Sequence, residues 1–195
     1  MIHLSQENTS ELIKHLKSGS VVALPTETVY GLAISLDSAK ALEKLIYLKR
    51  RDIGSGKVFT LVPESKHAIE TYATLNRKSR SLIAKHFPGE LTLILPKNPD
   101  FHHPYFDHFL SIGIRIPAHP LFSESILSQT GPLLLTSANP RGDTPALNSA
   151  TVEQTMPKVD VIVDGTSGNH LPSTIVSFVE SPAQILRQGN LQISL

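Results

Sequence analysis

The sequence predicts an α/β (α+β) fold, built as a twisted, mixed sheet with flanking helices. Segments with helical and with strand-like periodicity alternate along most of the chain. The last strand-like segments come close together, which favours a mixed sheet over a strictly alternating one. The 195 residues are 40% hydrophobic and 18% charged, a globular composition. Neither a repeat nor a Pro/Ser-rich linker divides them, so we expect a single domain over residues 1–195.

The first elements are a helix, a strand and a second helix. Apolar residues recur at helical spacing from Ser10 to about Lys17, and Gly19 is a stop signal. Residues 21–24 form an apolar run typical of a short buried strand. We expect Asp37 to cap a helix over residues 38–49, because an apolar stripe of leucines and an isoleucine follows it.

The rest of the chain continues the alternation. Strands are expected over residues 58–62, 91–95, 112–116, 132–137, 159–163, 173–179 and 183–187. Helices are expected near residues 64–73, 77–86, 120–129 and 149–155. The sequence FPG ends the pattern of the second of these helices, and a Pro/His-rich loop joins the strands at 91–95 and 112–116.

Composition narrows the classes of function. The chain has no cysteine, which excludes disulfides, thiolate metal ligands and a cysteine nucleophile. It contains no run of about 18 apolar residues that would cross a membrane. The polar start lacks the apolar core of a signal peptide, so a cytoplasmic location is expected. The net charge of +1 neither demands nor excludes a nucleic-acid partner.

Polar residues gather where predicted strands begin and end. These groups are Thr26-Glu27-Thr28, Ser137-Ala138-Asn139, Ser173-Thr174, Arg115 and Arg187. In open α/β sheets, ligands bind at strand ends, where loops converge. Hydroxyl and amide groups can hydrogen-bond phosphate, sugar or carboxylate, and arginines neutralise negative charge. Turn formation or surface placement explains any one of these groups, but five together favour a binding site.

A run of cations over residues 47–57 surrounds two glycines. It contains Lys49, Arg50, Arg51 and Lys57, and a glycine-rich turn with cations suits a polyphosphate. The spacing is not that of a Walker A loop, because Arg51 and Val58 stand where that pattern needs Gly and Ser or Thr. By itself the run is also explained as solvated charge at a helix C-terminus.

The loop HHPYFDH, residues 102–108, raises the possibility of a metal site. Its histidines (His102, His103 and His108) and Asp107 match no zinc spacing, and loop histidines are usually exposed. We predict no metal ligand here. The absence of a G-x-S-x-G motif gives no support to a serine hydrolase.

Taken in order, the motifs resemble those of the YrdC/TsaC family, the L-threonylcarbamoyladenylate synthases. The matching segments are LPTETVYGLA, LKRR (a K-x-R pattern), FPGELTLIL, IGIRIPAHP, LLLTSANPRGDTPA, LPSTIVSF and ILRQG. They span about residues 10 to 190, and although each is weak, the ordered set is specific. The length suggests the short, single-domain form.

This resemblance implies a nucleotidyltransferase with a YrdC-like fold around a concave, positively charged cavity. L-Threonine, bicarbonate (or CO₂) and ATP would give threonylcarbamoyl-AMP and pyrophosphate. The product would supply a downstream threonylcarbamoyl transferase, which modifies adenosine 37 of tRNAs reading ANN codons. Mg²⁺ would arrive with ATP, and no organic prosthetic group is implied. The alternative is a non-catalytic module of the same fold that binds double-stranded RNA or tRNA.

The resemblance also implies roles for individual residues. Lys49 and Arg51 would bind the ATP phosphates and promote catalysis, Ser137, Asn139 and Arg187 would contact the nucleotide, and Thr28, Arg115 and Ser173 would bind L-threonine. The family usually has proline after K-x-R, whereas this chain has Asp52 and a slightly longer segment. Either Ser55 or Lys57 would therefore fill the next phosphate-contacting position.

Overall fold

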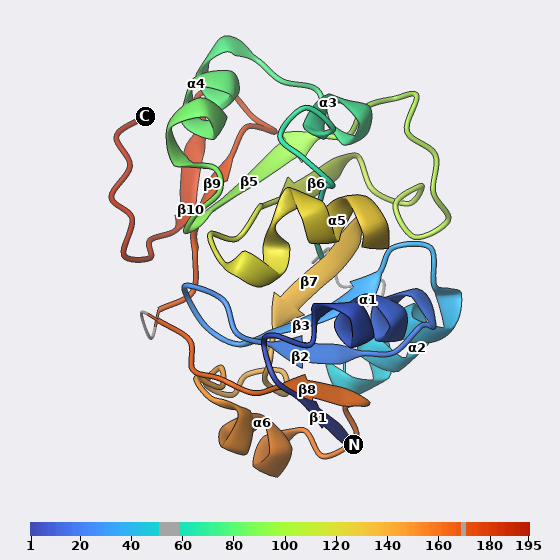
Figure 1. Ribbon diagram of the computed structural model, residues 1–195. Coiled ribbons are helices and arrows are strands. Elements are labelled where there is room, and N and C mark those ends of the chain that lie inside the picture. Colours follow the sequence, from blue (N-terminus) through green and yellow to red (C-terminus); the bar gives the residue numbers. More distant parts are fainter. Residues whose placement is uncertain (51–58, 169–170) are drawn as a thin grey trace.

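The computed structural model describes residues 1–50, 59–168 and 171–195. Its strands are β1 (Ile2–Leu4), β2 (Val22–Leu24), β3 (Gly31–Ser35), β4 (Thr60–Val62), β5 (Leu91–Pro96), β6 (Ser111–Ile114), β7 (Leu133–Ser137), β8 (Val161–Val163), β9 (Thr174–Ser177) and β10 (Gln184–Arg187). Within these residues the strands form one ten-stranded sheet in the order β1-β8-β2-β3-β7-β4-β6-β5-β9-β10. Figure 1 shows the sheet twisting through the molecule.

The sheet is mixed, as the sequence predicts. β3 pairs antiparallel with both β2 and β7, whereas β4 pairs parallel with β6 and β5 pairs parallel with β9. Among the described residues, β10 pairs only with β9 at one edge, and β1 pairs only with β8 at the other. The predicted strand at 58–62 is described as the shorter β4, because Val58 lies outside the described part of the chain and Phe59 is not in the strand.

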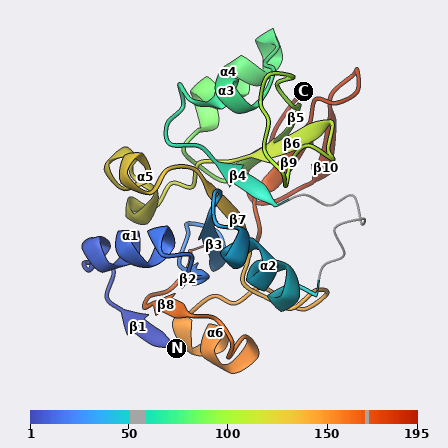
Figure 2. The same cartoon turned by 90° about the vertical axis from the view of Figure 1, so that its right-hand side faces the viewer.

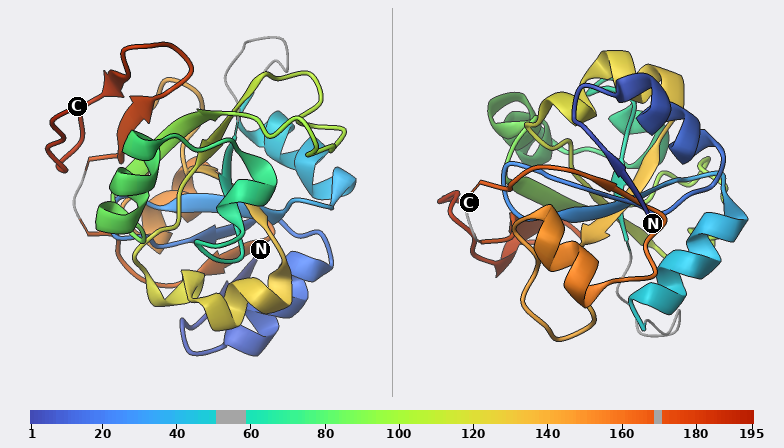
Figure 3. Two further views of the ribbon diagram at one scale, coloured as in Figure 1. Left: turned by 90° about the horizontal axis from the view of Figure 1, so that it is seen from above. Right: turned by 60° about the horizontal axis from the view of Figure 1, so that its bottom comes forward.

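Helices cover both faces of this sheet. They are α1 (Thr9–Lys17), α2 (Ala39–Leu48), α3 (Ile69–Tyr72), α4 (Arg77–His86), the 3₁₀ helix η2 (Pro120–Phe122), α5 (Glu124–Thr130) and α6 (Ser149–Thr155). Figures 2 and 3 show α1 and α5 side by side, whereas α2 and α6 pack on the sheet away from this pair. No helix among the described residues is long and apolar enough to span a bilayer.

Two hydrophobic clusters fill the space between helices and sheet. Leu12 and Leu16 of α1 pack with Leu127 of α5 and with Val22 and Leu24 of β2. The other cluster takes Val21 and Ala23 from the same segment, together with side chains of α2, α3, α4 and α6. Because side chains alternate along a strand, both faces of this segment are buried. That explains why its sequence is a continuous apolar run.

The structure corrects three expectations about elements and adds two strands. Helix α2 is capped by Ser38, whose hydroxyl accepts from the Ala41 N–H at 3.2 Å, and not by Asp37. The helix expected near 120–129 is divided at Ser123 into η2 and α5, and the helix near 64–73 is only α3. Strands β1 and β3 were not expected.

Candidate functional site

A cavity of about 520 Å³ opens among strands β3 to β7, β9 and β10. Its lining includes the cations Arg115 and Arg187 and the hydroxyls of Ser137, Ser173, Thr60 and Thr92. No carboxylate is among the described residues that line it. The cavity therefore presents positive charge and hydroxyl groups, which suits an anionic, oxygen-rich ligand.

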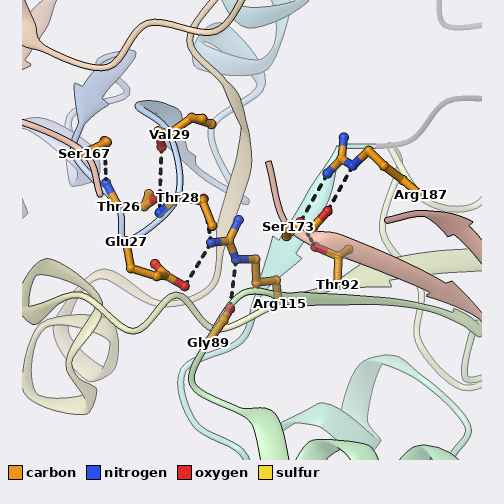
Figure 4. Close-up of polar contacts among 10 residues, drawn as sticks. All are labelled: Thr26, Glu27, Thr28, Val29, Gly89, Thr92, Arg115, Ser167, Ser173 and Arg187. Atoms are coloured by element: carbon orange, nitrogen blue, oxygen red, sulfur yellow. Dashed lines mark hydrogen bonds and ion pairs between the residues drawn. The ribbon is translucent and has the colours of Figure 1, made fainter. Parts of the chain in front are cut away.

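Arg115 follows β6 and is held from three sides. Its Nη2 donates to Oε1 of Glu27 at 2.9 Å and to Oγ1 of Thr28 at 2.8 Å, and its Nε donates to the Gly89 carbonyl at 3.1 Å. Figure 4 shows these contacts converging on one guanidinium. The side chains of Arg115 and Glu27 are only 8% and 16% exposed, so this ion pair is largely desolvated.

Thr28 lies behind Arg115 and has no exposed surface. The Thr26 hydroxyl donates to the Val29 carbonyl at 2.8 Å, so its only hydrogen is used. The 2.9 Å contact between the two threonine hydroxyls must then have Thr28 as the donor. The chain of hydrogen bonds thus runs from Arg115 to Thr28 to Thr26, and it leaves Thr28 no hydrogen for a ligand.

A second group joins β5 to the chain before β9 and to the end of β10. The Ser173 hydroxyl lies 2.8 Å from that of Thr92, and Arg187 donates from Nε to the Ser173 carbonyl at 2.9 Å and from Nη2 to the Ser173 hydroxyl at 3.2 Å. A side chain at Gly189 would place its Cβ 2.4 Å from the Pro172 carbonyl oxygen. This close approach of the two segments requires glycine, and it brings Arg187 against Ser173.

A third group supports the end of β7. Lys49 Nζ donates to the Ser137 carbonyl at 2.6 Å, to the Asn139 carbonyl at 2.6 Å and to Asn139 Oδ1 at 2.9 Å. Ser137 also donates to Asn139 Oδ1 at 2.6 Å. Lys49 is 6% exposed, and Ser137 is the member of this group that lines the cavity. Lys49 and Asn139 therefore hold the hydroxyl of Ser137 in place.

The two arginines at the cavity influence each other. Burial lowers the pKa of Arg187, and the charge of Arg115 lowers it further. Because an arginine pKa begins so high, Arg187 stays protonated, and the two charges repel across the cavity. Glu27 offsets the charge of Arg115 from behind. An anionic ligand between the arginines would relieve the remaining repulsion.

The predicted site residues fall into three groups. Arg115, Ser137, Ser173 and Arg187 line the cavity, and Thr28, Lys49 and Asn139 contact lining residues from behind. Arg51, Ser55 and Lys57, together with Asp52, lie outside the described residues. In the described part of the chain, no cluster of three or more histidine or acidic side chains could hold a metal, the loop at 102–108 included.

Thr92 and Glu27 are two residues of the site that the sequence analysis does not predict to be functional. Thr92 is the only polar residue within the LTLIL run, and an isolated hydroxyl in a buried strand was the signal that could have identified it. Glu27 belongs to a predicted binding segment, but no role was assigned to it. Its partner Arg115 is far away in the sequence, so the pair becomes visible only in three dimensions.

A family model that covers Sua5, YciO and YrdC, and that is described as telomere recombination, matches residues 14–189. The chain belongs to the Sua5/YciO/YrdC family. Two curated family members illustrate the likeness. The threonylcarbamoyl-AMP synthase of Vibrio campbellii is 32% identical over 188 residues, which cover 94% of this chain and 100% of the relative. A putative threonylcarbamoyl-AMP synthase of Methanocaldococcus jannaschii is 31% identical and covers 97% of this chain and 91% of the relative.

Solved structures of the family share this fold. The crystal structure of P. abyssi Sua5 complexed with L-threonine matches with a TM-score of 0.85 at 26% identity. The match covers 97% of this chain but only 57% of that longer protein. The crystal structure of E. coli YciO matches with a TM-score of 0.83 at 22% identity, over 97% of this chain and 94% of that one, which shows the fold alone.

Proposed function

We propose that this chain is an L-threonylcarbamoyladenylate synthase, which forms threonylcarbamoyl-AMP and pyrophosphate from L-threonine, bicarbonate and ATP. The observation that carries the proposal is that Arg115, Ser137, Ser173 and Arg187, from four separate family motifs, line one cavity. The nearly full-length likeness to proteins named threonylcarbamoyl-AMP synthase supports the same activity.

The amino acid is proposed to bind beside Arg115. Nη1 of this arginine has no hydrogen-bond partner among the described residues, so its two N–H groups are available to a carboxylate. The hydroxyl pair of Ser173 and Thr92 has one hydrogen left after its mutual bond, and this hydrogen can be donated to substrate. Thr28, which we assigned to threonine binding from the sequence, contributes through Arg115 in this arrangement.

The nucleotide is proposed to bind near Ser137 and Arg187. Lys49 and Asn139 would hold the Ser137 hydroxyl as an acceptor for N–H or O–H groups of the nucleotide, because its own hydrogen is donated to Asn139. Arg187 would supply charge for the phosphates. Contacts from Arg51, and from Ser55 or Lys57, stay predictions from the sequence. Mg²⁺ would enter as part of the MgATP substrate, carried by phosphate and water, since no carboxylate is among the described lining residues.

Positioning and charge neutralisation are the chemistry that this site can supply. Threonine and bicarbonate give a carbamate with loss of water, and a carbamate oxygen then attacks the α-phosphorus as pyrophosphate leaves. The protein needs no nucleophile of its own for this displacement. Buried arginines and fixed hydroxyls can hold the two reactants in line and stabilise negative charge on the phosphates. In the proposed biological role, tRNA and a threonylcarbamoyl transferase receive the product.

The test is pyrophosphate release with MgATP, in the presence and absence of L-threonine and bicarbonate. Release should require both. L-Serine should be poorer by roughly 1–3 kcal/mol in kcat/KM if the cavity recognises the threonine methyl group. Release that does not depend on an amino acid would contradict the proposal. RNA binding with no release under any condition would instead indicate the non-catalytic module.

A further inference from the structure

The hydrogen bonds of Arg115 are divided unequally between its two ends. A guanidinium has five N–H donors, and three of them are used by Glu27, Thr28 and Gly89. Both N–H groups of Nη2 are taken, whereas Nη1 makes no hydrogen bond with the described part of the chain. In Figure 4 the three contacts fix Nε and Nη2, which leaves the Nη1 end of the guanidinium free. The orientation of this free end depends on the three acceptors.

Glu27 is the only charged acceptor of the three, and its placement is unfavourable for stability. Its Oε2 atom is buried and is the one such side-chain atom in the described residues without a hydrogen-bond partner. A buried ion pair gives little net stability even when every group is satisfied, and an unmet carboxylate oxygen adds a further cost. Stability therefore does not account for a carboxylate here.

The geometry around Arg115 does account for a carboxylate at position 27. Gly89 and Thr28 are neutral acceptors, so neither offsets the repulsion between Arg115 and Arg187 that helps to lower the pKa of Arg187. Without Glu27, only these two neutral acceptors would hold the guanidinium against the repulsion from Arg187. Because Glu27 does not line the cavity, its effect on a ligand must pass through Arg115.

We propose that Glu27 is a positioning residue of the amino-acid subsite, holding Arg115 so that Nη1 faces the carboxylate of the substrate. The inference rests on the proposed function, which supplies the substrate. It assigns to the Thr-Glu-Thr segment an indirect role, because Glu27 and Thr28 both accept from the same arginine nitrogen.

The experiment compares Glu27→Ala, Glu27→Gln and the control Glu43→Gln, which changes an exposed acid on α2. KM is measured separately for L-threonine and for ATP, and thermal unfolding confirms that each variant folds. Glu27→Ala should raise KM for L-threonine about 10- to 100-fold, since small misplacements of a binding group cost this much. KM for ATP should change far less. Glu27→Gln, which keeps an acceptor but loses the charge, should recover only part of the loss, and Glu43→Gln should match the wild type.

A double-mutant cycle with Arg115→Lys tests whether Glu27 acts through Arg115. Lysine cannot donate the same fork of hydrogen bonds, so Glu27→Ala should add little to the Arg115→Lys penalty. Any of three results would overturn the proposal: penalties of the two substitutions that multiply, a KM of Glu27→Ala for L-threonine within twofold of wild type, or an equal rise in the KM values for L-threonine and ATP.

The binding of L-threonine to the same variants is measured by calorimetry. Binding that depends on Glu27 without pyrophosphate release would refute the proposed function alone, and a wild type that binds no L-threonine would refute both.

Discussion

Lys49 shows how a residue can serve a site without lining it. Its ammonium has three N–H donors, and three oxygens of Ser137 and Asn139 lie within 2.9 Å of it. A lysine that is 6% exposed and so well supplied with acceptors is a structural support for the loop after β7. A phosphate could recruit this ammonium only by replacing some of those oxygens.

We therefore expect Lys49→Met to impair the use of ATP more than that of L-threonine. The substitution keeps the volume but leaves buried carbonyl and amide oxygens without their donor, at a cost of about 1–3 kcal/mol for such a group. Pyrophosphate release should show kcat/KM for ATP reduced by roughly 10- to 100-fold. The control is Lys40→Met, on an exposed position of α2. An unchanged kcat/KM for ATP in folded Lys49→Met would contradict this role.

At the scale of elements, the segment after β6 connects the site to η2. Arg115 directly follows this strand, and His119 precedes η2, whose Leu121 N–H donates to the His119 ring at 3.4 Å. Burial lowers the pKa of His119, although the nearby Glu27 carboxylate partly opposes this effect. Nδ1 of the His119 ring must carry no proton in order to accept this capping hydrogen bond.

This arrangement predicts a loss of stability in mild acid. A histidine whose pKa is lowered by folding binds more protons in the unfolded chain than in the folded one. Its contribution to the free energy of unfolding is therefore full above the unfolded pKa of about 6.5, and it declines as the pH falls toward the folded pKa. Thermal unfolding between pH 7.5 and 5.5 should show a falling Tm. His119→Asn keeps a capping side chain but removes this titration, so its Tm should fall less. Equal slopes for the two proteins would exclude His119 as a source.

Each feature that the sequence prediction missed has its own physical cause. β3 has five buried residues, but its GLAIS sequence begins with glycine and ends with serine, so it lacks the strong apolar run of a central strand. β1 has only three residues, which are too few to show a periodic pattern, and among the described strands it pairs only with β8. Asp37 and Ser38 are both good capping residues, and only the backbone conformation decided between them.

At the scale of the whole molecule, the sequence predicted the mixed sheet and which motifs carry polar residues, but not how those residues divide the work. Chain order cannot reveal that Thr28 lies behind Arg115 or that Lys49 reaches the loop after β7, because these partners are 87 to 90 positions apart. Burial and hydrogen-bond direction separate the lining residues from their supports. Those quantities exist only once the strands are assembled.

The lining strands occupy neighbouring positions in the sheet, from β3 through β10, so a bound ligand should stabilise the whole fold. L-Threonine at about 100 times its Kd should add about 2.7 kcal/mol to the free energy of unfolding. For a chain of this size that corresponds to a Tm increase of about 5–10 °C. The shift should grow with concentration, be much smaller for D-threonine, and nearly vanish in Arg115→Lys, whose lysine cannot keep the Nη1 donors in place. A shift equally large in wild type and Arg115→Lys would mean that L-threonine binds elsewhere on the protein.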